Sequence, residues 1–556
     1  MNGHSSSSYF CPANGALLLR WCFLAVVTFW FLLLLTNCGN NTIHATPPPS
    51  GSFGDANLTG TYVFSVAGSD ISGNFVAIAG SFVADGKGSI SSGIIEVNNS
   101  GRGALLAQPV TEGSYSVGVD GRPSGTAGLL KLRSSSLAYS FDYVLSSSTQ
   151  GLITEFDSNG SGSGTLDLQS DVTQGSLAGQ SFAFNLSGTF GSDSGFCGSN
   201  TSIVTVLPLS TVGAFSLDPN GNITSGLQDL NFNCISDSAT NLQITSGAVS
   251  LSSNPGTATL VNPVITLHFD VFPVDATHLK FIETDPLPIM VGDAYLQVSS
   301  MPAGNNVFTL AGFDVVKGGP FTSSGILDAD GSGNIRPDSV EDINDAGKAS
   351  TIKGTISGTY TDLLQGRSTL SLTGFDNGSG GQVCSNCLFA AYPSIGGLQL
   401  LEIDDKGMTN GVAYSQTSTS IAPSLSFGMN LSGSNSSGAE DDIAEFVVNN
   451  GALNGLIDFN DQGLTSFGHR LSANYAADAN VPGRGTVTSN SLNLVTYIVD
   501  GSDIAFVEVD QNQVGIGVLN SQTAGAVAHM VSMQPLRRAA FFPRVGFGAI
   551  KALPRR

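Results

Sequence analysis

The sequence contains the same set of short motifs four times, and this internal repetition constrains the fold more than any other feature. The first motif is an aromatic residue or Met, any residue, Val or Leu, a small residue and then Gly. Its four copies are Phe64–Gly68, Phe184–Gly188, Phe308–Gly312 and Met429–Gly433. The copies recur at intervals of about 120 residues, a length that suits one small domain each. Four domains of one architecture are therefore expected along the 556-residue chain.

Two further motifs follow the first in a fixed order. The second is a turn that opens on Asp or Asn and closes on Gly, which is typical of a β-hairpin whose last turn residue has a positive φ. It occurs at Asp85–Ile90, Asp218–Ile223, Asp330–Ile335 and Asn460–Leu464. The third motif, an acidic residue followed by an aliphatic residue and Asn, occurs at Glu96–Asn98, Asp229–Asn231 and Asp342–Asn344 and is missing from the fourth copy.

The later motifs carry charged and amide side chains. A Gly-Arg dipeptide stands at Gly121-Arg122, Gly366-Arg367 and Gly483-Arg484. A Glu-x-Asp motif occurs in all four copies, as Glu155 and Asp157, Glu283 and Asp285, Glu402 and Asp404, and Glu508 and Asp510. Each copy closes on a strand that ends in Gln169, Gln297, Gln416 or Gln522. Several motifs that recur in one order exclude a chance likeness within a Gly-rich chain.

Short apolar runs separated by Gly, Asn and Asp predict many short strands joined by tight turns. Sequential hairpins of this kind predict an all-β fold, a tandem array of four antiparallel β-meander domains that close into small up-and-down barrels. Aligned β-sandwiches are the alternative. The domains are expected at 56–169, 177–297, 302–416 and 425–522, after an N-terminal hydrophobic helix.

The N-terminus has the pattern of an export signal. Arg20 precedes an apolar run from Trp21 to Leu35. The following residues, Leu35–Gly39, resemble a bacterial lipobox, in which the signal is cut before a Cys that becomes lipidated. The resemblance implies that 1–37 is the signal and that Cys38 carries the lipid. It also implies that the protein is sorted to the outer membrane. Residues 38–55 include three consecutive prolines and are expected to form a semi-rigid tether. An uncleaved helix anchored in the inner membrane is the alternative.

Charge excludes one class of partner. The net charge is −22, and nucleic acid is therefore excluded, because its binding needs a basic surface that displaces counterions. Basic residues cluster only in the C-terminal tail, 523–556.

From about residue 56 to 522, the chain resembles the Gly/Ser/Thr-rich extracytoplasmic repeat lipoproteins of the Acidobacteria type. The residues that carry the resemblance are Phe64–Gly68, Gly80–Gly86, Ser92-Gly93 and Glu155–Asp157. That group has no established biochemical activity, so the resemblance implies a location and a repeat architecture only.

The Glu-x-Asp motifs place two carboxylates on one face of a strand, about 7 Å apart. Such a pair can act as acid and base on a glycoside. Four identical dyads in one chain would be unusual for an enzyme. The eight carboxylates are therefore expected to be structural, accepting hydrogen bonds from turn N–H groups or pairing with the Gly-Arg residues.

Oxygen-bearing side chains at Asp328, Asp330, Ser332 and Asn334 resemble the first half of a calcium loop. The twelfth place of that loop is Ser339 instead of Glu, so a plain hairpin turn is favoured over a calcium site. No cofactor is expected.

Four cysteines remain once the signal is removed and Cys38 is lipidated, an even number that suits an oxidising compartment. We predict disulfides between Cys197 and Cys234 and between Cys384 and Cys387, with the other two pairings left open.

Three function classes remain. The leading one is a membrane-tethered, non-enzymatic protein of the cell envelope, with a role in adhesion or in binding polysaccharide or another envelope component. The alternative is a small-ligand carrier that uses the barrel interiors. A glycoside hydrolase that uses the Glu-x-Asp pairs is the third class, and the sequence contains no His-Glu-x-x-His, phosphate loop or nucleophile-elbow motif to support another enzyme class.

Overall fold

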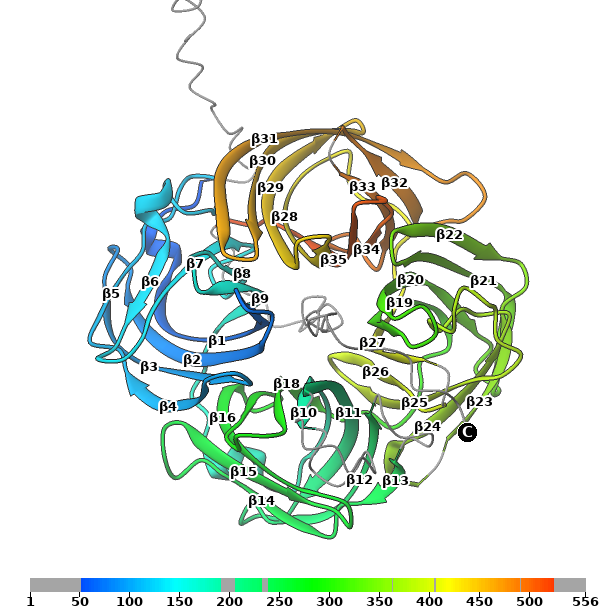
Figure 1. The fold of residues 1–556 in the computed structure, drawn as a ribbon, viewed down its shortest axis with the longest axis horizontal. Coiled ribbons are helices and arrows are strands. Elements are labelled where there is room, and N and C mark those ends of the chain that lie inside the picture. Colours follow the sequence, from blue (N-terminus) through cyan, green and yellow to red (C-terminus); the bar gives the residue numbers. More distant parts are fainter. Residues whose placement is uncertain are drawn as a thin grey trace, which may run out of the picture. The chain divides into compact units, whose positions relative to one another are not determined.

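Antiparallel strands make up most of the described chain. The computed structural model describes residues 52–191, 206–232, 239–362, 364–404, 407–490 and 492–524. Strands β1 to β35 form four sheets, one for each repeat (Figure 1). The all-β fold class is confirmed. The hydrophobic segment, Cys38 and the tail from 525 onward lie outside the described residues.

Repeats 1 and 2 are strips of nine strands. Repeat 1 contains η1 (Asp55–Asn57), β1 (Thr59–Asp70), β2 (Phe75–Asp85), β3 (Ile90–Asn99), β4 (Gly103–Pro109), β5 (Glu112–Ser114), η2 (Thr126–Gly128), β6 (Leu130–Arg133), β7 (Ala138–Leu145), β8 (Gln150–Glu155) and β9 (Gly160–Leu168). Repeat 2 contains η3 (Gln174–Leu177), β10 (Ser181–Gly191), β11 (Val206–Leu217), β12 (Ile223–Phe232), β13 (Ala239–Gln243), β14 (Ser246–Ser250), β15 (Gly256–Val261), β16 (Thr266–Asp275), β17 (His278–Glu283) and β18 (Ile289–Leu296). Each strip is open between its fourth and fifth strands.

Repeats 3 and 4 close into barrels. Repeat 3 contains β19 (Gly304–Asp314), β20 (Gly319–Ala329), β21 (Asn334–Asp345), β22 (Lys348–Lys353), β23 (Ser357–Asp362), η4 (Leu364–Gly366), β24 (Ser368–Thr373), β25 (Cys387–Ser394), β26 (Gly397–Glu402) and β27 (Met408–Ser415). Repeat 4 contains β28 (Ser424–Asn435), β29 (Ala439–Asn449), β30 (Ala452–Asp461), β31 (Leu464–Ala477), β32 (Arg484–Thr488), β33 (Asn493–Ile498), β34 (Asp503–Glu508) and β35 (Gln513–Ser521). In repeat 3, β21 pairs with both β20 and β23, which closes the barrel and leaves β22 as an appended edge.

Strand order distinguishes the barrel from the sandwich alternative. Nearly all neighbouring strands are consecutive in sequence, and the first strand of each repeat also pairs with its last, as β1 does with β9. A sandwich would instead need strands that cross between two sheets. The repeats are therefore up-and-down meanders, two closed and two open.

Strand β1 shows how its sequence pattern produces this fold. Successive side chains point to opposite faces of a strand, so Tyr62, Phe64 and Val66 all face inward and join the buried cluster inside repeat 1. Val63 points outward and packs in a second buried cluster with Phe272 and other residues of repeat 2. Val63 is apolar although it points away from the barrel interior, because residues of repeat 2 cover it.

The aromatic residue of the first motif lies within this interior cluster and needs a small residue opposite it. Phe64 faces Gly80 on β2, and a Cβ at Gly80 would lie 2.9 Å from the Phe64 ring. Phe184 and Phe308 stand opposite Gly213 and Gly325 in the same way. Repeat 4 has the narrower Met429 and accepts Ala444 at that place.

The glycine that ends the first motif lies where the first and last strands of a repeat approach most closely. A Cβ added to this glycine would lie too close to a carbonyl oxygen of the last strand: 2.0 Å from Ser161 for Gly68, 1.8 Å from Ile289 for Gly188 and 1.9 Å from Met408 for Gly312. Any side chain there would push the two strands apart. This close approach explains why the motif ends on Gly.

Candidate functional site

The repeated motifs meet at the interfaces between neighbouring repeats, which we call seams 1–2, 2–3, 3–4 and 4–1. In seam 1–2, the side-chain amide of Asn98 donates hydrogen bonds to the carbonyl oxygens of Glu283 and Asp285, at 2.8 Å each. The equivalent amides in the other repeats also donate to backbone carbonyl oxygens. Asn231 donates to Glu402 and Gly407, and Asn460 donates to Glu155 and Gly160. Asn344 donates to Glu508, Asp510 and Gln513. The fourth repeat thus contacts the first, and the set of seams is closed.

This contact corrects one expectation from the sequence. The third motif is present in the fourth copy, as Asp458, Phe459 and Asn460 on β30. The residues Asn460–Leu464 are therefore not the second motif. The hairpin turn that precedes β30 lies at 449–452 instead.

The closing Gln residues join the same neighbours. Gln522 of repeat 4 donates from Nε2 to the carbonyl oxygens of Asp120 and Leu145 in repeat 1, at 2.7 and 3.0 Å. Gln169, Gln297 and Gln416 make the equivalent bonds to Pro273, Gln365 and Ile498 of the following repeat. The Gly of the Gly-Arg motif lies under this amide, since a Cβ at Gly366 would lie 2.4 Å from Nε2 of Gln297.

The Arg of the Gly-Arg motif pairs with the acidic residue of the third motif in the preceding repeat. Arg367 holds Asp229 through two parallel hydrogen bonds of 2.7 and 2.8 Å, and both side chains are buried. Tyr392 donates its hydroxyl to the same carboxylate at 2.6 Å. The equivalent pairs are Arg484 with Asp342 and Arg122 with Asp458. The expected pairing of these arginines with the Glu-x-Asp carboxylates is therefore not what the structure shows.

Seam 1–2 is built differently, because repeat 2 lacks the Gly-Arg motif. Glu96 of repeat 1 lies instead beside Asp270 of repeat 2, and burial followed by the nearby Asp270 carboxyl raises the pKa of Glu96. Further along the same seam, the buried Lys280 ammonium forms a salt bridge of 3.0 Å with Asp167. This seam therefore has a buried cation, but the lysine pairs with Asp167 and not with Glu96, the acidic residue of the third motif.

Each Glu of the Glu-x-Asp motifs is buried at the end of a strand. Glu283 and Glu402 have no exposed surface, and Glu155 and Glu508 have 2% and 1%. Burial raises the pKa of all four carboxyl groups well above the usual range. A glycosidase needs its carboxyls in contact with substrate, and these four are covered by protein.

The Asp of the same motif accepts hydrogen bonds from the backbone. Asp157 accepts from the N–H groups of Ser140 and Asn159, both at 2.8 Å. Asp404 and Asp510 accept in the same way from Leu388 and Asn493, and Asp285 contacts the His268 ring. These carboxylates end one strand and fix the start of its neighbour.

The candidate calcium residues lie in the hairpin between β20 and β21. Asp330 accepts from the Asn334 side-chain amide at 2.7 Å and from the N–H groups of Asn334 and Ser332 at 2.9 and 2.7 Å, and these bonds lower its pKa to about 2. Asp328 pairs with Arg336 at 3.2 Å. Among the described residues, no group of three or more His, Cys, Asp or Glu side chains is arranged to hold a metal ion.

Two of the four cysteines in the predicted disulfides lie within the described residues. Cys384 and Cys387 form a disulfide with their Cα atoms 5.7 Å apart. Cys197 and Cys234 lie outside the described residues, so their pairing stays a prediction.

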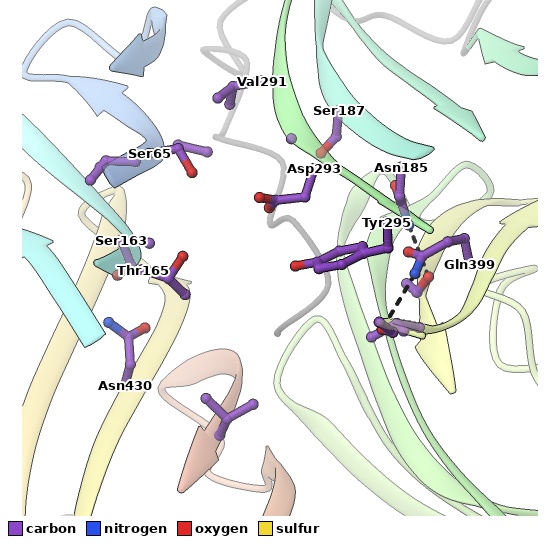
Figure 2. Close-up of a pocket in the computed structure, with 18 of the residues that line it drawn as sticks. Ser65, Ser163, Thr165, Asn185, Ser187, Val291, Asp293, Tyr295, Gln399 and Asn430 are labelled. Atoms are coloured by element: carbon purple, nitrogen blue, oxygen red, sulfur yellow. Dashed lines mark hydrogen bonds between the residues drawn. The ribbon is translucent and has the colours of Figure 1, made fainter. Parts of the chain in front are cut away.

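A cavity of about 110 Å³ is lined by residues of all four repeats, including the last strand of each. Figure 2 shows Asp293 and Tyr295 of β18 projecting toward Ser163 and Thr165 of β9. Asn430 of repeat 4 and Gln399 of repeat 3 complete the polar part of the lining. The cavity is therefore a shared feature that no single repeat contains.

Sequence reasoning did not find this cavity, although one signal for it was present. The second residue of the first motif is polar in every copy, as Ser65, Asn185, Thr309 and Asn430. That position points away from the barrel interior. A polar residue recurring between apolar neighbours indicates a face with its own chemistry.

Comparisons with known proteins leave the chain without a family. No protein-family model matches it, and no curated protein matches it. Among solved structures, transferrin-binding protein B of Neisseria meningitidis serogroup B has 11% identity and a TM-score of 0.18, over 68% of this chain and 85% of that chain. Intact Ap-TbpB, with N and C lobes, has 11% identity and a TM-score of 0.18, over 86% and 98%. A mutant of transferrin-binding protein B from Haemophilus parasuis Hp5 has 10% identity and a TM-score of 0.19, over 84% of this chain and 95% of that chain. Scores this low assign neither fold nor ligand.

The search for membrane-spanning helices covered the described residues. Within them, no helix has the length and apolar character needed to cross a bilayer.

We predict that Arg367→Met lowers the unfolding free energy by about 3–5 kcal/mol, because it leaves the Asp229 carboxylate buried without its cation. The double variant Arg367→Met with Asp229→Leu should recover most of that loss. Arg336→Met is the matched control, since its half-exposed pair with Asp328 should contribute less than about 1 kcal/mol. Urea denaturation followed by circular dichroism measures all three, and an equal loss for Arg367→Met and Arg336→Met would contradict the buried pair.

We predict that stability falls as the pH rises from 5 to 8. Burial raises the pKa of Asp142 to about 7 and that of Glu445 to about 8, so the folded chain keeps protons that the unfolded chain has already released. The stabilisation by these protons is complete at pH values below the ordinary carboxyl pKa, and it is lost as the pH rises through the raised pKa values. Each retained proton changes the unfolding free energy by up to about 1.4 kcal/mol per pH unit.

Thermal denaturation at pH 5, 6.5 and 8 measures this slope, and Glu445→Gln should flatten it. Asp85→Asn is the control. Hydrogen bonds lower the pKa of the exposed Asp85 carboxyl, so this carboxyl changes the stability only at pH values below 4. A wild-type melting temperature that rises between pH 5 and pH 8 would count against the buried carboxyls.

Proposed function

We propose that this chain is a membrane-tethered extracytoplasmic protein with a non-enzymatic role in the cell envelope, in which the four repeats form a rigid platform that binds polysaccharide. The observation that carries this proposal is the location of the repeated residues. The recurring Asn side chains and Glu carboxyls are buried in the seams, and the recurring Arg and Gln side chains are buried or partly buried there. The residues that the four copies share are those that assemble the repeats, which supports a binding scaffold.

The low charge density of the surface supports an uncharged polymer as the partner. Charged residues are 12% of the chain, about half the usual fraction, while the net charge of −22 opposes anionic polymers. Neutral glycans are recognised by hydroxyl and amide groups, and Ser, Thr and Asn are abundant on these strands and turns. A neutral polysaccharide is therefore the envelope component that this composition fits.

The alternative of a carrier with ligands inside the barrels is not supported. The interior of each repeat is filled by a buried apolar cluster, for example the cluster that contains Phe64, Phe82 and Phe141. The two described cavities, of about 110 and 170 Å³, lie between repeats. Figure 2 shows this for the first of them, whose labelled residues come from different repeats.

The tether sets how far the platform can reach. If Cys38 carries the lipid, 19 residues lie between it and Leu58 at the start of repeat 1. A fully extended chain of that length spans at most about 70 Å. The repeats would then work close to the membrane surface.

We predict that radiolabelled palmitate enters the wild-type protein in a bacterial host and does not enter Cys38→Ser. The physical reason is that the lipid is attached to the Cys38 sulfur, which a hydroxyl cannot replace. Cys384→Ser is the matched control and should be labelled normally, because its thiol lies within a disulfide. Equal labelling of wild type and Cys38→Ser would rule out this anchor.

We predict that the purified full-length protein is retained on at least one neutral cell-wall or plant polysaccharide coupled to a resin. The same polysaccharide in solution should elute it, while 0.5 M salt should not, because the binding of a neutral glycan involves little charge. Columns of an anionic polysaccharide serve as the comparison. Passage through every neutral column without delay would exclude the polymer-binding role.

A further inference from the structure

The cavity at the centre of the four repeats has the chemistry of a binding site. We propose that it holds one unit of a neutral molecule rich in hydroxyl groups, the chemistry of a single sugar residue. This inference rests on the proposed function and names the place where a glycan end would bind. The cavity volume of about 110 Å³ is many times the roughly 10–15 Å³ that one water molecule requires, so it suits one small ring and not a length of polymer.

Polar side chains line the cavity from more than one side. Asn185, Ser187 and Tyr295 from repeat 2 and Thr165 from repeat 1 present amide and hydroxyl groups (Figure 2). Hydroxyl groups both donate and accept hydrogen bonds, and a side-chain amide does the same through its two ends. This mixture matches the hydroxyl groups of a sugar better than it matches a ligand that only donates or only accepts.

A buried acceptor without a partner lies in the same lining. Asn430 is 1% exposed, and its Nδ2 donates to the Ile153 carbonyl and the Thr154 hydroxyl. Its Oδ1 has no hydrogen-bond partner among the described residues. In Figure 2 the oxygen is the end of this amide that faces the cavity. Buried acceptors are usually satisfied, so a ligand hydroxyl is the group that this site needs.

Apolar side chains lie between these polar groups. Leu152, Val412 and Val518 line the cavity, from repeats 1, 3 and 4, and Leu152 and Val518 are the cross-strand partners of Thr165 and Asn430. A sugar ring has C–H groups between its hydroxyls, and these can contact the apolar side chains while the hydroxyls reach the neighbouring polar groups. This mixture of apolar and polar lining favours a ring that carries both kinds of group.

The charges near the cavity are paired with one another, which favours a neutral ligand. The Lys280 ammonium lies 3.0 Å from Asp167 and 3.3 Å from Asp293. His278 contacts Asp293 at 2.8 Å. Lys280 also donates to the Thr165 hydroxyl at 2.7 Å, which fixes that polar residue of the lining. A charged ligand would enter a site with no counter-ion set aside for it.

Isothermal titration of the full-length protein with glucose, galactose, mannose and N-acetylglucosamine tests the proposal. At least one of these should bind with one-to-one stoichiometry. The charged relatives of the sugar that binds, its amine and its uronic acid, should bind at least about tenfold more weakly.

Ser187→Leu should reduce the affinity at least about tenfold by filling the cavity, and Ser187→Ala, which removes one hydroxyl of the lining but leaves the space open, should reduce it less. Val518→Phe fills the cavity from repeat 4 and provides a second test if Ser187→Leu fails to fold. Unchanged affinity in both filled variants would overturn the proposal. The absence of binding by every neutral sugar would also overturn the proposal. If the protein were then still retained on polysaccharide columns, the proposed function would stand and only the cavity would be ruled out as the binding site.

Discussion

The structure depends on a hydrogen-bonding requirement at the ends of buried strands. The carbonyl groups of Glu283 and Asp285 lie where β17 ends, and burial next to another repeat removes water as their partner. Buried carbonyl groups need a donor, and the Asn98 amide of the neighbouring repeat supplies it. The same arrangement recurs at each seam, and the fourth repeat satisfies the first through Asn460. Because each repeat completes another, the four must assemble together.

That assembly explains why so many acids in an acidic protein are buried. A seam that excludes water also removes solvation from the carboxyls beside it, which raises the pKa of Glu402 and Glu508. Arg367 compensates one such acid directly, and seam 1–2 shows what happens without an arginine. There the Glu96 carboxyl lies beside Asp270, and its raised pKa favours a proton where the other seams have a cation. The buried acid of the third motif is therefore neutralised by an arginine in three seams, and in seam 1–2 its raised pKa favours the neutral form.

The sequence predicted the fold well because its signals are local. Turn residues and alternating apolar residues lie within a few positions of one another, and the four copies place each strand. The seams could not be read in the same way, because Arg367 and Asp229 belong to different repeats and nothing in their local patterns relates them. The fourth copy of the third motif was hidden for a different reason: Asn460 fits both a seam amide and a turn opener, and Phe459 breaks the aliphatic pattern. Only its contact with Glu155 decides between them.

The central cavity follows from how the two faces of the first strand are used. Inward positions such as Phe64 are fixed by barrel packing, and seam positions such as Asn98 are fixed by the neighbouring repeat. The outward second position of the first motif varies among Ser, Asn and Thr, and its Asn residues bond to a neighbouring repeat, Asn185 to Gly411 and Asn430 to Ile153. This position lines the cavity in three of the repeats, so a substitution there changes the cavity while leaving the strands in place. A scaffold of this kind can change its ligand without changing its fold.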